Sequence, residues 1–200
     1  MRQPTLVLAH GAGAGKDHPW MRQVTQALTA AGLRVVTFNF PYIDAKRGAP
    51  DRPAVLEETI ARVWREAAAE AQGPMFAGGK SMGGRIASQV AARVGFDPPA
   101  AGLLFFGYPL HPPGRPEQRR DAHLANITAP MLFLQGTRDP FGSPDEMQAL
   151  VKTLGRLARL EIVDDGDHSL VAPKRTDSKS LERAIAIAAA WILDRAQSGR

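Results

Sequence analysis

Six short runs of apolar residues recur along the chain, and helical patterns separate most of them. The runs read TLVLAH, RVVTFNF, PMFAGG, GLLFFGY, PMLFLQG and RLEIVDD. In each run apolar residues follow one another instead of alternating with polar ones. This is the pattern expected for strands of a parallel sheet that is covered on both faces. Repeated strand-helix units imply right-handed crossovers. The sequence therefore predicts an α/β fold, a three-layer αβα sandwich around a doubly wound, six-stranded, all-parallel sheet.

The helices between these runs have recognisable ends. The first is expected to start at about Pro19 and to close at Gly32, and the second stops at Gly73-Pro74. A later helix opens with the capping box Ser143-Pro144-Asp145-Glu146, and the last starts at about Ser178. We interpret the apolar stripes of these helices as core packing.

Size and composition narrow the function classes. With 200 residues, 44% of them hydrophobic, the chain is expected to form one domain, residues 1–200. It has no cysteine, which excludes disulfides and thiolate metal sites. We expect a cytoplasmic protein without a membrane partner, because no signal peptide precedes the first strand and no apolar run reaches the roughly 20 residues of a membrane span. The net charge is +5, but the basic residues are scattered, so no nucleic-acid partner is expected.

The turn after the third apolar run, GGKSMGGR at 78–85, has two competing interpretations. A phosphate-binding P-loop needs Gly, four residues and then Gly-Lys-Ser/Thr, but Pro74 stands where the first glycine should be. The candidate at Gly15-Lys16 also fails, since His10 replaces the first glycine and Asp17 the hydroxyl residue. Residues 79–83 instead fit G-x-S-x-G, in which a serine sits on a strained turn between a strand and a helix.

A helix is expected directly after this turn. Ile86, Val90 and Val94 lie at helical spacing before Gly95, a plausible residue to end the helix. This strand-turn-helix context favours the interpretation of Ser81 as a nucleophile.

Three strand ends carry the residues of a candidate catalytic triad. Ser81 follows the third strand, Asp139 in GTRDPFG follows the fifth, and His168 in DDGDHSL follows the sixth. The carboxyl ends of the strands are where ligands bind in an open parallel sheet, so these side chains can meet there. An imidazole can take the serine proton and return it to the leaving group, and a carboxylate holds the imidazole in the correct tautomer. We assign His168 as the base and Asp139 as the acid of the triad. The nearer carboxylates of the histidine loop are interpreted as turn residues: Asp164, Asp165 and Asp167.

A tetrahedral intermediate needs backbone N–H donors for its oxyanion. The N–H of Met82, at the start of the third helix, is one candidate, and the helix dipole also favours negative charge there. The second is expected in HGAGAG, residues 10–15, where Ala12 is the best candidate. A glycine-rich segment after a strand is also compatible with a turn alone.

Other residues near the strand ends are assigned to the substrate pocket or to the scaffold. The residues expected to shape the pocket are Tyr42, Leu110, Phe141 and Met82. Arg85 and Lys80 either contact an anionic group or pair with neighbouring carboxylates. His10 is expected to orient the loop that follows it by hydrogen bonding. His18, His111 and His123 lack the spacing of metal ligands, so we expect no metal and no cofactor.

The longest irregular segment runs from Pro109 to Pro130 and contains the basic stretch RPEQRRDAH. We interpret it as a loop, with or without a short helix, rather than as a second domain. Two roles remain open: the segment covers the site, or it contacts a partner. Its basic residues either border a pocket for an anionic substrate or form a solvated loop.

These motifs together resemble the α/β-hydrolase superfamily, and most closely its small dienelactone-hydrolase-like members. The resemblance is carried by AHGAGAGKDHPWM, GGKSMGGRIAS, GYPLHPPGRPEQRRDAHL, LFLQGTRDPFG and GDHSL, and spans nearly the whole chain. The motifs look like those of a subgroup of short hydrolase-like proteins. In animals this subgroup is similar to a testis-expressed protein and to a subunit of a histone acetyltransferase complex. The resemblance implies the strand order 2-1-3-4-5-6, a minimal fold without a cap domain, and the triad Ser81, Asp139 and His168. Dienelactone hydrolases usually carry cysteine as nucleophile, and this chain has serine.

The sequence thus predicts a serine hydrolase that cleaves a small-molecule ester or thioester through an acyl-enzyme. The alternative is a catalytically weak protein-binding module that keeps the fold. Nucleotide binding is disfavoured by the failed P-loop spacing. Oligomeric state does not follow from the sequence.

Overall fold

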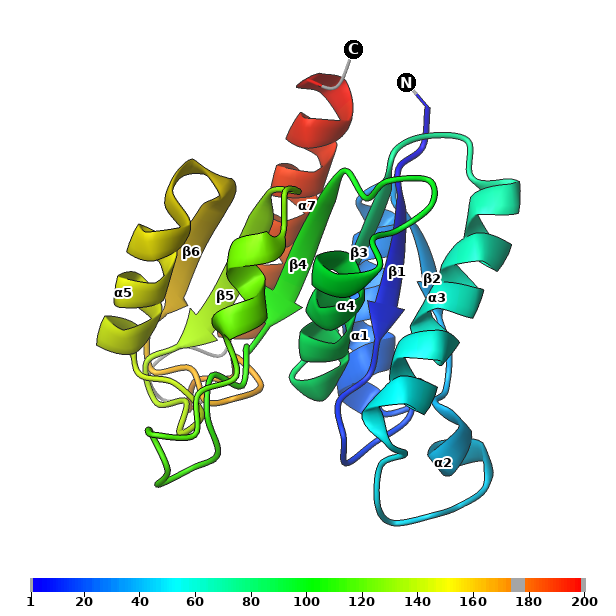
Figure 1. Ribbon diagram of the computed structural model, residues 1–200. Helices are drawn as coiled ribbons and strands as arrows, with labels where there is room; N and C mark the ends of the chain where they lie inside the picture. The colour runs from blue at the N-terminus through cyan, green and yellow to red at the C-terminus, as the bar shows by residue number, and fades with distance from the viewer. Residues whose placement is uncertain (1, 174–178, 199–200) are drawn as a thin grey trace.

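The computed structural model describes residues 2–173 and 179–198, and Figure 1 shows them as a sheet between two layers of helices. The strands are β1 (Thr5–Ala9), β2 (Arg34–Thr37), β3 (Met75–Lys80), β4 (Gly102–Phe106), β5 (Met131–Gly136) and β6 (Ala158–Val163). The α-helices are α1 (Pro19–Ala30), α2 (Pro41–Asp44), α3 (Pro53–Glu70), α4 (Met82–Arg93), α5 (Pro144–Leu154) and α7 (Ser180–Ser198). Two short 3₁₀ helices are η1 (Ala122–Asn126) and η2 (Gly155–Leu157).

The six strands form one sheet in the order β2-β1-β3-β4-β5-β6, and every neighbouring pair is parallel. This confirms the predicted fold class and the strand order. The strands β1 and β3 lie side by side from Thr5 opposite Met75 to Ala9 opposite Gly79. Because all strands run in the same direction, their carboxyl ends gather at one edge, which is the lower edge in Figure 1.

Both faces of the sheet are buried, which explains the continuous apolar runs. In β1, Leu6 and Leu8 belong to the core beneath α1 and α7, whereas Val7 and Ala9 belong to the core beneath α3 and α4. A third cluster packs β4 and β5 against α5 and the segment that follows β4. Successive strand residues point to opposite faces, so apolar residues are needed at every position.

The observed helix ends match most of the sequence signals. Pro19 opens α1, and the capping box of α5 forms through Ser143 and Glu146. The expected start of the last helix, at about Ser178, lies outside the described residues, which show α7 from Ser180. One helical residue was placed wrongly: Val94 caps α4 and its side chain is 84% exposed, so it does not extend the apolar face of Ile86 and Val90.

Residues 2–173 and 179–198 form no cap domain over the carboxyl edge of the sheet. The segment from Pro109 to Pro130 contains only η1, as the sequence analysis allowed. Within the same described ranges, no helix has the length and apolar content required to cross a membrane.

Candidate active site

Ser81 occupies a tight turn between β3 and α4. Its backbone has φ 49° and ψ −120°, a left-handed conformation that is strained for a residue with a side chain. The N–H of Ser81 donates to the carbonyl of Phe106, the last residue of β4, at 3.1 Å. Gly79 and Gly83 pack against the backbone of Ala9 and His10 so closely that a Cβ on either would overlap it. The two glycines of the motif therefore allow the turn to form against β1.

Ser81, His168 and Asp139 form one line of hydrogen bonds. The distance from Ser81 Oγ to His168 Nε2 is 2.8 Å, and that from His168 Nδ1 to Asp139 Oδ2 is 2.7 Å. The Asp139 side chain is completely buried, and that of His168 is 20% exposed. The structure thus brings together the three residues that the sequence placed at three strand ends, with one ring nitrogen for the serine and the other for the carboxylate.

Gly107 packs directly against His168. It follows β4 with φ +66°, and a Cβ at this position would lie 2.6 Å from the His168 backbone oxygen and 3.2 Å from Nδ1. On the other side, the Phe141 ring lies 4.2 Å from the imidazole, centre to centre. The imidazole is held between a glycine and an aromatic ring, which restricts its rotation.

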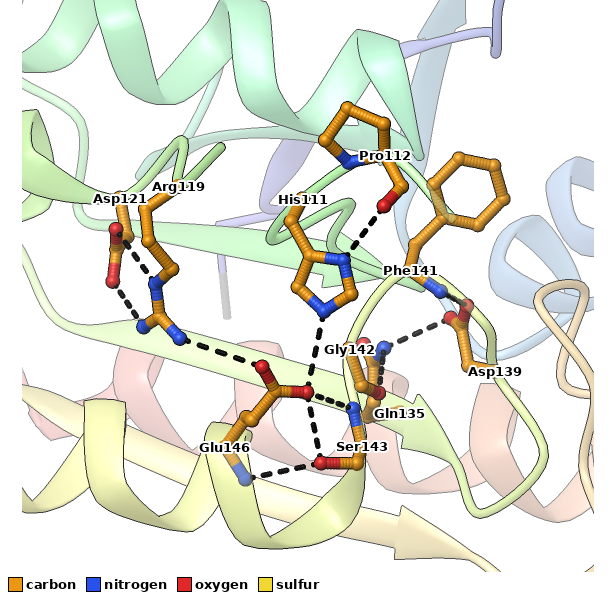
Figure 2. Close-up of polar contacts among 10 residues, drawn as sticks. All are labelled: His111, Pro112, Arg119, Asp121, Gln135, Asp139, Phe141, Gly142, Ser143 and Glu146. Carbon is orange, nitrogen blue, oxygen red and sulfur yellow. Dashed lines mark hydrogen bonds and ion pairs between the residues drawn. The ribbon is translucent and has the colours of Figure 1, made fainter. Parts of the chain in front are cut away.

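Asp139 is bound from behind by groups of its own loop and of β5, as Figure 2 shows. The N–H of Phe141 donates to Oδ1 at 2.9 Å, and the amide of Gln135 donates to Oδ2 at 2.8 Å. Beyond Gly142, Ser143 donates to Glu146 from its backbone N–H and its hydroxyl, and these bonds help lower the pKa of Glu146 to about 2. The loop that carries the acid is therefore fixed at both ends.

The loop after β1 is anchored through its carbonyl oxygens. Phe40 donates its N–H to His10 Nε2, so the proton of the ring is on Nδ1, which donates to the Gly11 carbonyl at 2.8 Å. Burial lowers the pKa of His10, in keeping with a neutral ring. The Tyr42 hydroxyl donates to the Ala12 carbonyl at 2.8 Å. In a trans peptide the C=O and the following N–H point in opposite directions, so the N–H of Ala12 points away from His10.

A pocket of about 400 Å³ opens above Ser81. Its lining consists of Gly11, Ala12, Gly13, Ala14, His18, Met21, Lys80, Ser81, Phe141, His168 and Ser169. Of the residues that the sequence analysis assigned to the substrate pocket, Phe141 is in this lining, as is Ala12, which it assigned to the oxyanion. His18 and Met21, from the start of α1, were not anticipated because the path of the loop between β1 and α1 has no sequence signal.

Four of the residues expected at the pocket lie outside this lining. Tyr42 is on α2, is 1% exposed and supports the loop after β1 from behind. Leu110 is fully buried in the cluster beneath α5. Arg85 is one turn along α4 from Ser81; burial lowers its pKa, with a smaller effect of the nearby Arg120, and its Nε has no hydrogen-bond partner among the described residues. Met82 likewise turns its side chain into the core, 7% exposed.

Lys80 lines the pocket, and no ion pair joins it to a carboxylate among the described residues. Its Nζ donates to the backbone carbonyl of His168 at 3.0 Å and lies 5.0 Å from the centre of the Trp20 ring. Trp20 in turn donates its indole N–H to the carbonyl of Ser169 at 2.9 Å. Burial lowers the pKa of Lys80 to about 8, which carboxylates at Asp167 and Asp139 partly oppose. Two side chains thus hold consecutive carbonyls of the histidine loop.

The depressed pKa of Lys80 predicts a pH-dependent effect on stability. Below about pH 8 the folded state holds a desolvated ammonium; between about pH 8 and 10.5 the folded chain loses this proton while the unfolded chain keeps it, so stability rises with pH. We expect the free energy of unfolding of the native chain, relative to Lys80→Met, to increase over this window by up to roughly 3 kcal/mol. Urea unfolding at several pH values measures it. Lys152→Met, at an exposed position of α5, is the matched control, and a flat difference for Lys80→Met contradicts the prediction.

A second Ser-His contact lies on the other side of α4. Ser88 Oγ is 2.8 Å from His123 Nε2, but Ser88 is fully buried and also donates to the Arg85 carbonyl. Burial and the charge of Arg85 lower the pKa of His123. Among the described residues no carboxylate is hydrogen-bonded to His123, and neither residue lines the pocket. This pair has the distance of a catalytic pair without its exposure.

Within the basic stretch of the segment after β4, Arg119 is ion-paired. Arg119 pairs with Asp121, and its guanidinium also lies 3.7 Å from Glu146 on α5 (Figure 2). His111 forms a hydrogen bond with Glu146 Oε2 at 3.2 Å.

Asp167 accepts hydrogen bonds from the N–H groups of Ser169 and Val171, the turn role expected for it. No group of three or more His, Cys, Asp or Glu side chains able to hold a metal occurs in residues 2–173 and 179–198.

Comparison with known proteins agrees with this architecture. The family described as an alpha/beta hydrolase domain matches residues 2–195. The chain is similar in structure to a dienelactone hydrolase from Anabaena variabilis, with a TM-score of 0.76, 19% identity, and coverage of 96% of this chain and 87% of that one. An alpha-beta serine hydrolase homologue from Coxiella burnetii has a TM-score of 0.71 and 19% identity, covering 97% and 88%. A serine hydrolase without lid from Xanthomonas campestris has a TM-score of 0.70 and 18% identity, covering 99% and 83%.

Proposed function

The chain belongs to the alpha/beta hydrolase domain family, and we propose that it is a serine hydrolase that cleaves a small ester or thioester through an acyl-enzyme intermediate. Family membership supports hydrolase activity. The observation that carries the finer proposal is the unbroken line from Ser81 Oγ through the two nitrogens of His168 to Asp139, at the floor of a pocket. We assign Ser81 as nucleophile, His168 as general base and acid, and Asp139 as the carboxylate that orients it.

In the proposed reaction Ser81 Oγ attacks the acyl carbon while its proton passes to His168 Nε2. The imidazolium that forms is stabilised by Asp139, which already accepts the Nδ1 proton. The leaving alkoxide or thiolate takes the proton from Nε2 and departs, leaving the acyl group on Ser81. Water then attacks the acyl-enzyme with His168 again as base; the bond between the acyl carbon and Ser81 Oγ breaks, Oγ takes the proton back from Nε2, and the acid is released.

The oxyanion of each tetrahedral intermediate is assigned to the backbone N–H groups of Ala12 and Met82. Met82 is the first residue of α4, so its N–H has no partner within the helix. Ala12 lines the pocket, and its carbonyl and that of Gly11 are bound on the opposite side by Tyr42 and His10. This anchoring supports a preorganised donor, the property on which oxyanion stabilisation depends.

The proposed substrate class is a small ester or thioester. A pocket of about 400 Å³ suits a small acyl group, and the described chain places no cap domain over it. Apolar walls from Met21 and Phe141 are suited to the carbon atoms of such an acyl group.

Reaction with a fluorophosphonate probe, read by intact mass, tests the assignment of the nucleophile and base. We expect stoichiometric labelling of the native chain, and loss of labelling in Ser81→Ala and His168→Ala, because the phosphonylation requires an activated serine. Ser88→Ala and His123→Ala are matched controls from the second Ser-His contact and should label like the native chain.

Two results would overturn the proposal. A folded native chain that does not react with the probe would support a binding module that keeps the fold without turnover. Labelling that survives in Ser81→Ala and disappears in Ser88→Ala would move the nucleophile to the other contact.

A further inference from the structure

We propose that Gln135 is a positioning residue of the hydrolase. Through three hydrogen bonds its amide fixes Asp139 relative to Gly107, the residue that packs against His168. The inference rests on the proposed function and adds a residue to which no catalytic role has been assigned. Gln135 is the one polar side chain in the apolar run of β5 and is fully buried. A buried polar side chain in a strand core is retained only where its bonding groups are satisfied.

The orientation of the Gln135 amide follows from its neighbours. The backbone N–H of Tyr108 lies 2.9 Å from Oε1, and an N–H can only donate, so the oxygen of the amide faces Tyr108. The NH₂ group therefore faces the acid loop. One of its hydrogens goes to Asp139 Oδ2 at 2.8 Å and the other to the Gly142 carbonyl at 3.2 Å (Figure 2). Both N–H groups of the amide and one lone pair of its oxygen are thus used.

This arrangement fixes how Asp139 can act. Oδ1 accepts the N–H of Phe141, and Oδ2 accepts from both Gln135 and His168. Three donors thus face the two carboxylate oxygens. The Gln135 bond acts on the same oxygen that accepts the His168 proton, so Gln135 sets the position of that oxygen and shares its negative charge.

Gln135 also joins two strand ends that the triad needs. Tyr108 follows Gly107, the residue on which the His168 ring rests, while Gly142 lies in the loop that carries Asp139. A single amide therefore couples the position of the backbone beside His168 to the position of Asp139. Loss of the amide should disturb the alignment of the two rather than the binding of substrate.

The charged and titratable groups around this point are few enough to allow a pH test. His168 faces Asp139 from the loop after β6, and Lys80 acts on it from the end of β3. Glu146 on α5, paired with His111, lies behind Ser143, and Tyr108 directs its hydroxyl to the Arg120 carbonyl. A carboxyl group introduced at position 135 would add one further titration next to Asp139.

The first experiment measures kcat and KM for p-nitrophenyl butyrate with Gln135→Met. We expect kcat to fall roughly 10- to 100-fold with KM changed less than about threefold, because the supporting bonds of the acid are lost while the pocket stays intact. The matched control is Gln148→Met, the same exchange at an exposed position of α5. Values within about twofold of this control would overturn the inference.

The second variant, Gln135→Glu, keeps the shape of the side chain and distinguishes positioning from packing. When protonated, the new carboxyl can donate to Asp139 as the amide does, but when ionised it repels it. We expect kcat relative to the native chain to fall at least about tenfold between about pH 6 and about pH 9. A pH-independent ratio would contradict the inference even if Gln135→Met fails to fold. A native chain without turnover or probe labelling would instead contradict the proposed function itself.

Discussion

Replacement of Ser81 by alanine should reduce turnover of p-nitrophenyl butyrate by roughly 10⁵- to 10⁶-fold, the range seen when the nucleophile of a Ser-His-Asp enzyme is removed. The loss is large because no covalent intermediate can form, and the donors assigned to the oxyanion can assist only direct attack by water. The side chain is small, and the positive φ of the turn is as strained for alanine as for serine, so the fold should be kept. Steady-state kinetics with matched circular dichroism spectra measures both.

Ser169→Ala provides the control, because Ser169 lines the same pocket and contacts the neighbouring elements through its backbone carbonyl. We expect its kcat to stay within a few-fold of the native value. Comparable losses in both variants would show that turnover depends on the general polarity of the pocket rather than on one nucleophile.

Asp139→Asn should lower kcat by about 10⁴-fold, the loss known for the same exchange in Ser-His-Asp proteases. In the native chain, Asp139 Oδ2 accepts hydrogen bonds from Gln135 and from His168 Nδ1. An amide NH₂ at that position could not accept either bond, and one at the other position would face the N–H of Phe141. The imidazole would turn to the tautomer with its proton on Nε2, which cannot accept the serine proton.

The kinetics of Asp139→Asn should be compared with those of Asp164→Asn, an exposed carboxylate of the histidine loop. We expect KM to change little in either variant, and kcat to fall only in the first. Activity of Asp139→Asn within tenfold of the native value would remove Asp139 from the triad and direct attention to the other carboxylates near His168.

The sheet and the triad geometry followed from the sequence because both depend on patterns that repeat or meet by topology. Continuous apolar runs report strands with two buried faces, and parallel strands bring their carboxyl ends to one edge, so residues as distant as Ser81 and His168 could be placed together. The glycines at 79 and 83 marked the turn because only they allow the close approach to β1.

The walls of the pocket could not be predicted in the same way, because they depend on loop paths. Tyr42 was expected at the mouth, but the short helix α2 carries it behind the loop it supports. Gln135 was passed over as part of an apolar run, although a lone amide among buried apolar residues is itself a signal. Lys80 had two plausible partners in sequence terms, and neither is the carbonyl that it binds.

The three residues of the proposed triad lie far apart along the chain, which links the proposed activity to the completion of refolding. Ser81 belongs to the first half, in which β1 pairs with β2 and β3, whereas Asp139 and His168 depend on β5 and β6 at the other edge. Contacts between residues so far apart in sequence form late, because the chain between them must be ordered first. During renaturation, recovery of the proposed hydrolase activity should therefore lag behind the far-ultraviolet circular dichroism signal, so that turnover reports when β5 and β6 join the part of the sheet that carries Ser81.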